Sequence, residues 1–415
     1  MSSSTTKTTE GVIACPECDY LHRVEELPAG AKALCVRCAA VLYRHIPRSL
    51  ERATALYAAA LLLFLLANAF PIIALDVGGR VEQTHLISAA GAFLRHDMAE
   101  LGVLVFLTSV LFPLVTIAGT LYVLLAVQAG WRAPGRAVAY RLVRAVAPWS
   151  LVGVFMLGLL VAVVKLLDLA TVVPGVSLYA YAGLLVVVAA ASANLDEGVI
   201  WPRLHHPGIP LPSLGSARQH GLVGCHVCAL VSPADVGASC PRCASPLHAR
   251  KHDAIVRTWA LVVSAALLFI PANLYPVMTV TRLGRGEPNT ILSGVVELIA
   301  NGMWPLALLV FFASIVVPVA KLGVLSFLLV SVQRSSPWRP RDRTLLFRVT
   351  EVVGAWSMVD VFLVAILAAL VRMDALALVV PGIGVTFFAA VVVLTMLAAH
   401  SFDPRLIWDH AEPRP

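Results

Sequence analysis

Residues 63–71 read LFLLANAFP, and residues 268–276 read LFIPANLYP. The likeness extends outward from these two stretches, because residues 63–127 align without a gap on 268–332 and residues 149–201 align on 356–408. Each copy is preceded by its own pair of CxxC motifs. The chain therefore holds one module twice, and places where the copies differ become informative.

The composition indicates an integral membrane protein. The 415 residues are 59% hydrophobic and 13% charged, which lies well outside the range of soluble globular proteins. Apolar stretches of about 20 residues are long enough to cross a hydrocarbon core of roughly 30 Å as helix. They occur near residues 53–75, 100–128, 149–168, 175–195, 258–281, 304–331, 350–371 and 376–400. The sequence predicts an all-α polytopic membrane protein with eight transmembrane helices in two tandem four-helix bundles.

Arginines indicate the orientation of the chain in the membrane. They gather before the first span, between spans 2 and 3 and between spans 6 and 7, whereas the opposite loops carry few. By the positive-inside rule, both termini and both CxxC regions are expected in the cytoplasm. The first 14 residues contain no signal-peptide pattern, which agrees with this orientation. The net charge of +7 is therefore attributed to topology and anionic lipid heads, not to nucleic-acid binding.

All eight cysteines lie in the four CxxC motifs. Two such motifs a dozen or so residues apart can present four thiolates in a tetrahedron, so we predict two structural Zn²⁺ sites of the zinc-ribbon type. A redox dithiol or rubredoxin-like iron is the alternative, although no thioredoxin-like βαβ pattern surrounds the motifs. Four thiolates leave no open position for catalysis. The predicted ligands are Cys15, Cys18, Cys35 and Cys38 in one ribbon and Cys225, Cys228, Cys240 and Cys243 in the other.

These features predict a sequence of domains. A segment rich in Pro, Gly, Ser and His separates the copies and is interpreted as a linker. Glycines near residues 77–81 and 280–286 predict a short two-stranded hairpin after the first span of each copy, and residues 339–343 are expected to form a solvated loop. The predicted order is a disordered N-terminus (1–11), zinc ribbon 1 (12–46), transmembrane bundle 1 (50–201), a linker (202–221), zinc ribbon 2 (222–250), transmembrane bundle 2 (254–408) and a C-terminal tail (409–415).

Lys321 in the sixth span and Asp360 in the seventh lie about ten residues, or roughly 15 Å, from the cytoplasmic ends of their helices. Ser314 and Ser357 share their helix faces, and Thr395 in the eighth span could complete the cluster. Ionisable groups at this depth cost several kcal/mol unless they are paired or wetted. The cluster is therefore either a salt bridge that locks the bundle or a polar gate or proton-linked switch.

The first copy lacks these charges. Thr116 stands at the position of Lys321, and Gly153 stands at the position of Asp360. Because one copy of the two has a charged core, we infer that the copies differ in function. We expect the second half to carry the function of the protein.

A second motif recurs near the outer end of the first span of each copy. Asn68 and Pro71 are matched by Asn273 and Pro276. Proline frees a backbone carbonyl that the asparagine amide could satisfy, so the motif predicts a helix kink. A role in opening a path between helices is the alternative.

The sequence gives no support for an enzyme. It has no phosphate-binding loop, no dinucleotide-binding glycine motif, no HExxH and no nucleophile elbow. ATP-driven and hydrolytic chemistry are therefore not predicted.

The repeated arrangement of two CxxC motifs and four spans resembles the paraquat-inducible protein A family. The match includes ANAFP at 67–71, ANLYP at 272–276 and WSMVDVF at 356–362, and it extends from about Cys15 to Trp408. The resemblance implies a bacterial inner-membrane protein with tetraspanin-like four-helix bundles and zinc-binding ribbons. It also implies partnership with MCE-domain proteins, which form tunnels across the periplasm, and a central polar network at Ser314, Lys321, Ser357, Asp360 and Thr395.

The leading hypothesis is a lipid transporter subunit that moves phospholipid between the inner membrane and an MCE tunnel, with the Lys321–Asp360 pair as gate or proton-linked switch. The rival is a scaffold that anchors and assembles the tunnel without transporting lipid. A membrane redox enzyme that uses the dithiols is a third reading. The sequence does not indicate which lipid moves or in which direction.

Overall fold

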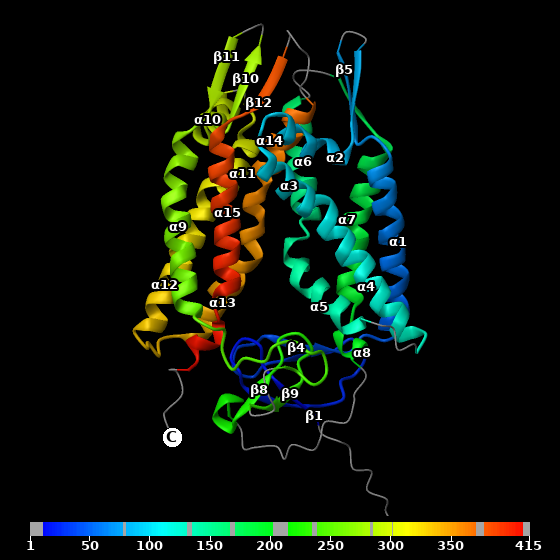
Figure 1. The fold of residues 1–415 in the computed structure, drawn as a ribbon, viewed down its shortest axis with the longest axis vertical. Helices are drawn as coiled ribbons and strands as arrows, with labels where there is room; N and C mark the ends of the chain where they lie inside the picture. The colour runs from blue at the N-terminus through cyan, green and yellow to red at the C-terminus, as the bar shows by residue number, and fades with distance from the viewer. Residues whose placement is uncertain are drawn as a thin grey trace, which may run out of the picture.

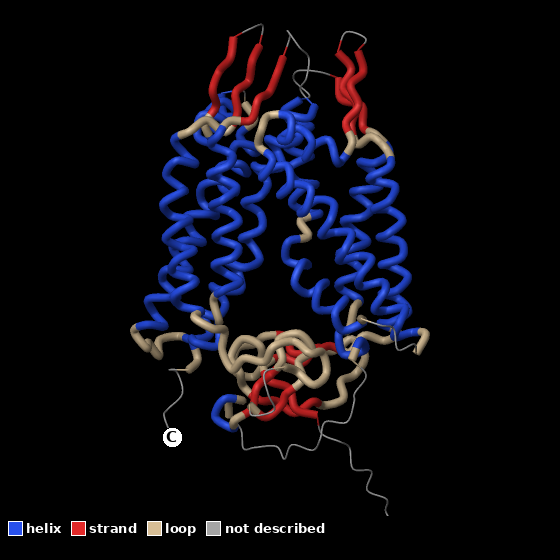
Figure 2. Tube along the Cα trace, in the orientation of Figure 1, coloured by secondary structure: helices blue, strands red, loops and turns tan. Residues whose placement is uncertain are grey.

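The computed structural model describes residues 11–77, 80–130, 135–166, 171–201, 215–234, 239–282, 285–300, 302–370 and 377–409. It is mostly helical, with the two cysteine-bearing ribbons at one end and two small sheets at the other (Figures 1 and 2). These two ends are called the ribbon end and the sheet end below. Residues 1–10 of the expected disordered N-terminus (1–11), residues 202–214 of the expected linker (202–221) and residues 410–415 of the expected tail (409–415) lie outside the described residues. Gly11 belongs to the first strand, so the N-terminal segment was predicted one residue too long.

Eight helical segments of the described chain are long and apolar enough to cross a membrane, as predicted. The first membrane half (residues 49–201) contains α1 (Ser49–Ala69), α2 (Leu86–Arg95), α3 (Ala99–Phe106), α4 (Phe112–Gln128), α5 (Arg136–Val146), α6 (Val152–Leu166), α7 (Val176–Asn194) and α8 (Glu197–Ile200). The second membrane half (residues 254–408) contains α9 (Ala254–Leu274), α10 (Ile291–Ala300), α11 (Trp304–Phe311), α12 (Val317–Gln333), α13 (Pro340–Gly354), α14 (Val359–Leu370) and α15 (Ile383–Ser401).

Short helical turns join several of these helices into longer spans. The π-helical turns η1 (Leu107–Leu111) and η4 (Phe312–Val316) link α3 to α4 and α11 to α12, so the second span of each half contains a π-helical turn at the same place. Pro113 and Pro318 are the second residues after these turns, and a proline has no N–H to give to the preceding helical turn. The 3-10 turns η2 (Ala147–Trp149) and η5 (Ala355–Met358) lead into α6 and α14.

The third spans begin earlier than predicted. Arginines were expected in loops before the third span of each half, but Arg141 and Arg144 lie on α5 and Arg343 lies on α13. The predicted loop at 339–343 is therefore wrong from Pro340 onward. Both helices carry apolar residues between their charged ones, and such an amphipathic pattern supports a helix at the membrane boundary.

The predicted hairpins are each extended by a third strand. β5 (Ile73–Val77) pairs with β6 (Arg80–Thr84) and with β7 (Thr171–Pro174), while β10 (Met278–Arg282) pairs with β11 (Arg285–Asn289) and with β12 (Ala377–Pro381). All pairings are antiparallel. The turn residues 78–79 and 283–284 lie outside the described residues. Each sheet ties the end of the first span to the start of the fourth.

The Asn–Pro motifs end their helices and do not kink them, which corrects the prediction for Asn68, Pro71, Asn273 and Pro276. The helices α1 and α9 stop at Ala69 and Leu274 because a residue before proline disfavours the helical region. The Asn68 amide donates to the carbonyl of Phe64 at 2.8 Å, and the Asn273 amide donates to that of Phe269 at 2.9 Å.

A glycine packs against the backbone that follows each of these helices. A Cβ on Gly175 would lie 2.1 Å from the carbonyl oxygen of Pro71, and a Cβ on Gly382 would lie 2.3 Å from that of Pro276. The backbones approach too closely for any side chain at these positions. This explains why glycine recurs at the equivalent positions 175 and 382.

The two halves meet through their third spans. Every residue of α14 is buried, and α14 contacts α6 and α2 of the first half as well as α15 of its own. The Phe155 and Phe362 rings lie 5.2 Å apart, and a Cβ on Gly158 would come within 3.0 Å of the Cβ of Phe362. The described spans therefore do not separate cleanly into the two four-helix bundles that we expected, because α14 packs against both halves.

Candidate functional site

The structure brings the eight cysteines together as the two predicted sets. Within each set the four sulfur atoms lie within 4.8 Å of one another, and all eight cysteines are buried. Cys15 Sγ lies 3.5 Å from Cys38 Sγ, and Cys225 Sγ lies 3.5 Å from Cys243 Sγ. A tetrahedral ion with metal–sulfur bonds of about 2.3 Å would hold its sulfurs roughly 3.8 Å apart. Each cluster could therefore hold one metal ion.

The same backbone turn occurs at all four CxxC motifs. The residue after the second cysteine has a left-handed conformation, with φ between 55° and 63°. Its N–H donates to the carbonyl of the first cysteine at 2.8–2.9 Å. These residues are Asp19, Ala39, Ala229 and Ala244. Four identical turns bring the cysteines of each pair onto one side, which a four-sulfur site requires.

Each cluster also has a polar neighbour that the sequence did not reveal. His22 Nε2 lies 3.2 Å from Cys35 Sγ in ribbon 1. In ribbon 2, Ser245 Oγ lies 3.1 Å from the sulfurs of both Cys225 and Cys243. Hydrogen bonds of this kind orient metal ligands and tune the charge on the sulfur. No spacing rule marks either residue, because both reach the sulfurs through the folded ribbon.

The two ribbons form one body. β1 (Gly11–Ala14) and β2 (Leu21–Val24) of ribbon 1 lie against β8 (Leu222–Gly224) and β9 (Val231–Pro233) of ribbon 2. The other hairpin of ribbon 1 is β3 (Lys32–Leu34) with β4 (Val41–Arg44). The end of the predicted linker, including η3 (Arg218–His220), joins this body, since Ala217 N–H donates to the Asp19 carbonyl at 2.8 Å.

Each ribbon is held by the membrane half of the other copy. Arg348 on α13 pairs with Glu17 of ribbon 1 at 2.5 Å, and it also reaches the Cys38 carbonyl at 3.5 Å. Arg141 on α5 donates to the Ala244 carbonyl of ribbon 2 at 2.8 Å. Arg141 and Arg348 occupy equivalent positions in the two copies. Each donates to a backbone carbonyl in the second CxxC turn of a ribbon. These contacts are crossed, with ribbon 1 on the second membrane half and ribbon 2 on the first. Arg44 of ribbon 1 also donates to the carbonyls of Ser192 and Ala193 in its own half, at 3.4 and 3.1 Å.

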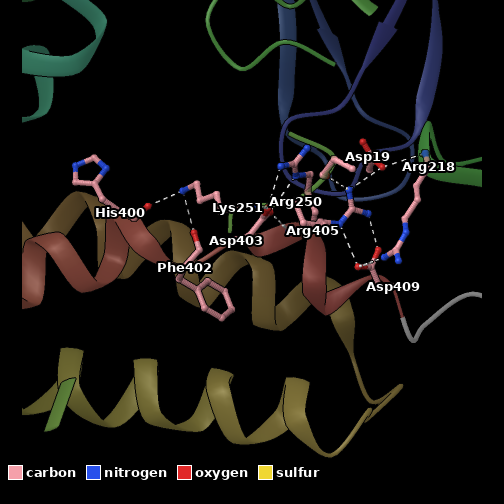
Figure 3. Close-up of polar contacts among 10 residues, drawn as sticks. Asp19, Arg218, Arg250, Lys251, His400, Phe402, Asp403, Arg405 and Asp409 are labelled. Carbon is pink, nitrogen blue, oxygen red and sulfur yellow. Dashed lines mark hydrogen bonds and ion pairs between the residues drawn. The ribbon is translucent and has the colours of Figure 1, made fainter. Parts of the chain in front are cut away.

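Arg250 fastens the ribbons to the end of the second membrane half (Figure 3). Its guanidinium lies 3.0 Å from Asp19 and 2.5 Å from Asp409, next to the turn η6 (Pro404–Ile407). Burial alone would lower the pKa of Arg250, but the carboxylates of Asp409 and Asp19 raise it well above its usual range. Arg250 stays charged and joins three segments that are far apart in the sequence.

The five residues of the predicted polar network are all buried, none more than 6% exposed. Ser314 on η4, Ser357 on η5 and Thr395 on α15 each donate to a carbonyl of their own helix, at 2.6, 3.4 and 2.9 Å. The elements that carry the network pack against one another, since η4 contacts η5 and α12 contacts α15.

Gly354 lies beside Lys321 and was missed from the sequence. A Cβ on Gly354 would lie 2.3 Å from Lys321 Nζ, so the ammonium rests directly on this glycine. No spacing rule marks Gly354, because the contact joins α12 to the last residue of α13.

Comparisons with known proteins agree with the duplication. The family model described as Paraquat-inducible protein A matches residues 50–205 and again residues 255–412. The chain is 34% identical over 406 residues to Intermembrane transport protein PqiA of Escherichia coli strain K12, covering 96% of this chain and 95% of that protein.

Two further relatives cover the chain to the same extent. Lipophilic envelope-spanning tunnel protein A of Escherichia coli strain K12 is 29% identical over 398 residues, or 96% of this chain and 91% of that protein. Probable intermembrane transport protein of Haemophilus influenzae is 26% identical over 410 residues, or 96% and 95%. No solved structure matches the chain.

Proposed function

We propose that this chain, which belongs to the paraquat-inducible protein A family, is the inner-membrane subunit of a system that moves phospholipid between that membrane and a periplasm-spanning tunnel of MCE-domain protein. The observation that carries the proposal is similarity over 96% of the chain to a protein named for intermembrane transport. The relatives are named as transport proteins, which favours a role other than catalysis.

The proposed orientation puts the ribbon end in the cytoplasm and the sheet end in the periplasm. The arginines of α5 and α13 support it, since both helices lie next to the ribbons and positive charge favours the cytoplasmic side. The proposed metal is Zn²⁺, one ion in each ribbon, because four thiolates with sulfurs 3.5 Å apart suit a closed tetrahedral site. With no open ligand position, each ion would act structurally.

The proposed gate is the buried polar network of the second membrane half. Lys321 is 3% exposed and Asp360 is 6% exposed, which is expensive for ionisable groups inside a bilayer unless they serve a function. A phospholipid head could meet these groups while its tails stay among apolar side chains. The first half has Thr116 and Gly153 at the same positions, so we assign the lipid path to the second half.

Photo-crosslinking in cells tests this path. A photoreactive amino acid at Val317, which is 5% exposed and one turn from Lys321, is expected to capture phospholipid in excess of the same group at Val319. Val319 lies on the same helix but is 50% exposed, so it reports contact with bulk lipid. Mass spectrometry identifies the attached lipid. Capture at Val317 no greater than at Val319 would contradict a path through the second half.

Removing the charge of Lys321 distinguishes the transporter hypothesis from the scaffold hypothesis. Lys321→Met keeps a long flexible side chain and removes the charge, so we expect normal abundance and tunnel assembly with lipid transfer reduced roughly 10-fold or more, the scale of a typical coupling free energy. The matched control is Thr116→Met at the equivalent position of the first half, which should transfer lipid normally. A Lys321→Met protein that assembles the tunnel and still supports full lipid transfer would favour the scaffold.

A further inference from the structure

Ribbon 1 exposes a small apolar patch that is absent from the described residues of ribbon 2. Among the described residues of the two ribbons, the exposed large apolar side chains are those of Leu34, Val36 and Val41, at 54%, 70% and 53%. Leu34 on β3 is the cross-strand partner of Val41 on β4, so their side chains lie side by side. Val36 follows two residues after Leu34, within the second CxxC motif. These three residues are called the apolar patch below.

The equivalent positions of ribbon 2 carry no large aliphatic side chain. Counted from the metal ligands, these positions hold Ser239, Pro241 and Pro246. Ser239 and Pro246 pair across the ribbon as Leu34 and Val41 do, so the backbones of the two ribbons are alike here. Ribbon 2 forms the same turn without large apolar side chains, so the fold does not require those of ribbon 1. An exposed apolar cluster that the fold does not require indicates an interaction surface.

The apolar patch lies where ribbon 1 meets a span of the second half. Arg341, the second residue of α13, donates to the carbonyl of Val36 at 2.9 Å and to that of Arg37 at 2.5 Å. The face of α13 that carries Arg341 continues through three apolar residues at helical spacing, each more than half exposed. They are Leu345, Val349 and Val352. Because lipid covers such a stripe on a membrane span, Val36 lies next to a lipid-facing surface.

The other strand of the same hairpin reaches a span of the first half. Arg44, the last residue of β4, donates to the carbonyls of Ser192 and Ala193 at the ribbon end of α7. Figure 1 shows the body formed by the two ribbons lying across the ribbon ends of both membrane halves, with β4 on the side toward the spans. The apolar patch is therefore held at the membrane boundary from two sides, and the bilayer is the apolar phase within its reach.

The chain around the apolar patch is basic. Residues 32–52 contain five lysines and arginines and one acidic residue, Glu51. Lys32 pairs across the hairpin with Arg44, two residues along β3 from Leu34. Apolar side chains flanked by cations are typical of segments that bind anionic bilayers, because the apolar groups enter the acyl layer while the cations meet the head groups. The charge pattern therefore favours a lipid surface over an apolar protein partner.

We propose that the apolar patch of ribbon 1 inserts into the bilayer surface at the ribbon end, among the head groups of anionic phospholipids. Ribbon 1 then binds the membrane directly, whereas ribbon 2 is attached through protein contacts such as that of Arg141. This contact sets the distance between the ribbons and the bilayer. The inference goes beyond the proposed function and does not depend on lipid movement, because it concerns where ribbon 1 lies when nothing is transported.

Fluorescence quenching by brominated lipid tests this contact in the intact protein. A fluorescent amino acid is incorporated at Val36 during translation, since a cysteine label would compete with the metal ligands. The protein is then placed in nanodiscs of phosphatidylglycerol and phosphatidylcholine with brominated acyl chains. Pro241, the equivalent exposed residue of ribbon 2, is the matched control. We expect at least about twofold greater quenching at Val36, because inserted apolar residues lie about 5–10 Å into the boundary between head groups and acyl chains.

Two variants connect the quenching to the patch and to its charge. Leu34→Gln with Val41→Thr removes apolar surface beside the label, and quenching at Val36 should fall to the level at Pro241. Both side chains are exposed, so the metal content of the protein should not change. Lys32→Gln leaves the patch intact, and it should reduce quenching in discs that contain phosphatidylglycerol but not in discs of phosphatidylcholine alone.

Quenching at Val36 no greater than at Pro241 would overturn the inference, as would quenching at Val36 that neither variant reduces. A photoreactive amino acid at Val36 in cells identifies any other occupant. We expect phospholipid as its main product. Crosslinks mainly to another protein, or to a second copy of this chain, would assign the patch to that partner and overturn the contact with lipid. Lipid capture at Val317 is measured separately, so failure of the proposed function is distinguished from failure of this inference.

Discussion

Replacing Cys15 with serine is expected to remove about one of two metal equivalents and to unfold ribbon 1. A serine hydroxyl does not ionise at neutral pH, so the site would keep three thiolates and bind metal far more weakly. Structural zinc sites of small domains contribute roughly 10–16 kcal/mol of apparent binding free energy, which is also their folding free energy. Metal analysis of the purified protein, together with its thermal unfolding curve, measures the loss.

The crossed arrangement makes a sharper prediction for this variant. Ribbon 1 touches α13 through Arg348, and its cysteines pack in one cluster with Leu328 of α12 and Phe402 beyond α15. Faster hydrogen exchange is therefore expected at the ribbon end of α12 and α13, in the half that does not follow ribbon 1 in the sequence. Cys225→Ser should instead expose α5, which holds ribbon 2 through Arg141. Exchange that rises in the membrane half of the same copy would contradict the crossed docking.

The sequence predicted the elements whose signals are local. Eight spans follow from eight long apolar stretches, and the metal ligands follow from the spacing of Cys15 to Cys18 and its three repeats. The helical nature of the arginine-bearing segments at 136–146 and 340–354 was missed. Charge at a membrane boundary suits a loop and an amphipathic helix equally well, so composition alone could not separate them.

What the sequence could not supply depends on contacts between distant segments. The third strands β7 and β12 are short and lie about 90 residues after the hairpins that they join, so no local pattern marks them. The crossed docking is equally hidden, because Arg141 and Arg348 look like ordinary positive-inside residues until the ribbons are placed. The contact between Lys321 and Gly354 is hidden for the same reason, because it joins α12 to the end of α13.

The contacts between ribbons and membrane halves make the two copies of the module depend on each other. Two copies that each folded alone would hold their own ribbons, but here each membrane half also holds the ribbon of the other. A shift between the halves must therefore strain the ribbon body, where Ala217 bonds to Asp19 and where Arg250 reaches Asp409. Conversely, the ribbon body and Arg250 together limit how far the two halves can separate at the ribbon end.

Arg250→Met is expected to destabilise this junction by about 3–5 kcal/mol, because it removes the cation that pairs with the buried Asp19 carboxylate and leaves Asp409 to the exposed Arg218. The side chain of Arg250 is 13% exposed, and those of Asp19 and Asp409 are 5% and 15% exposed. Arg250→Lys should recover only part of the loss, since a lysine cannot give the separate bonds that Nη1 makes to Asp19 and that Nε and Nη2 make to Asp409.

Arg218→Met is the control for this prediction, because Arg218 bonds to the same Asp409 at 3.0 Å but its side chain is 60% exposed. An exposed pair of this kind is worth at most about 1 kcal/mol. The apparent melting temperature of the detergent-solubilised protein should therefore fall clearly for Arg250→Met and hardly for Arg218→Met. Acidification should narrow the gap between Arg250→Met and the unaltered protein, since protonation removes the unpaired negative charge. Equal losses in the two variants would show that Arg250 is not the residue that joins the ribbons to the second membrane half.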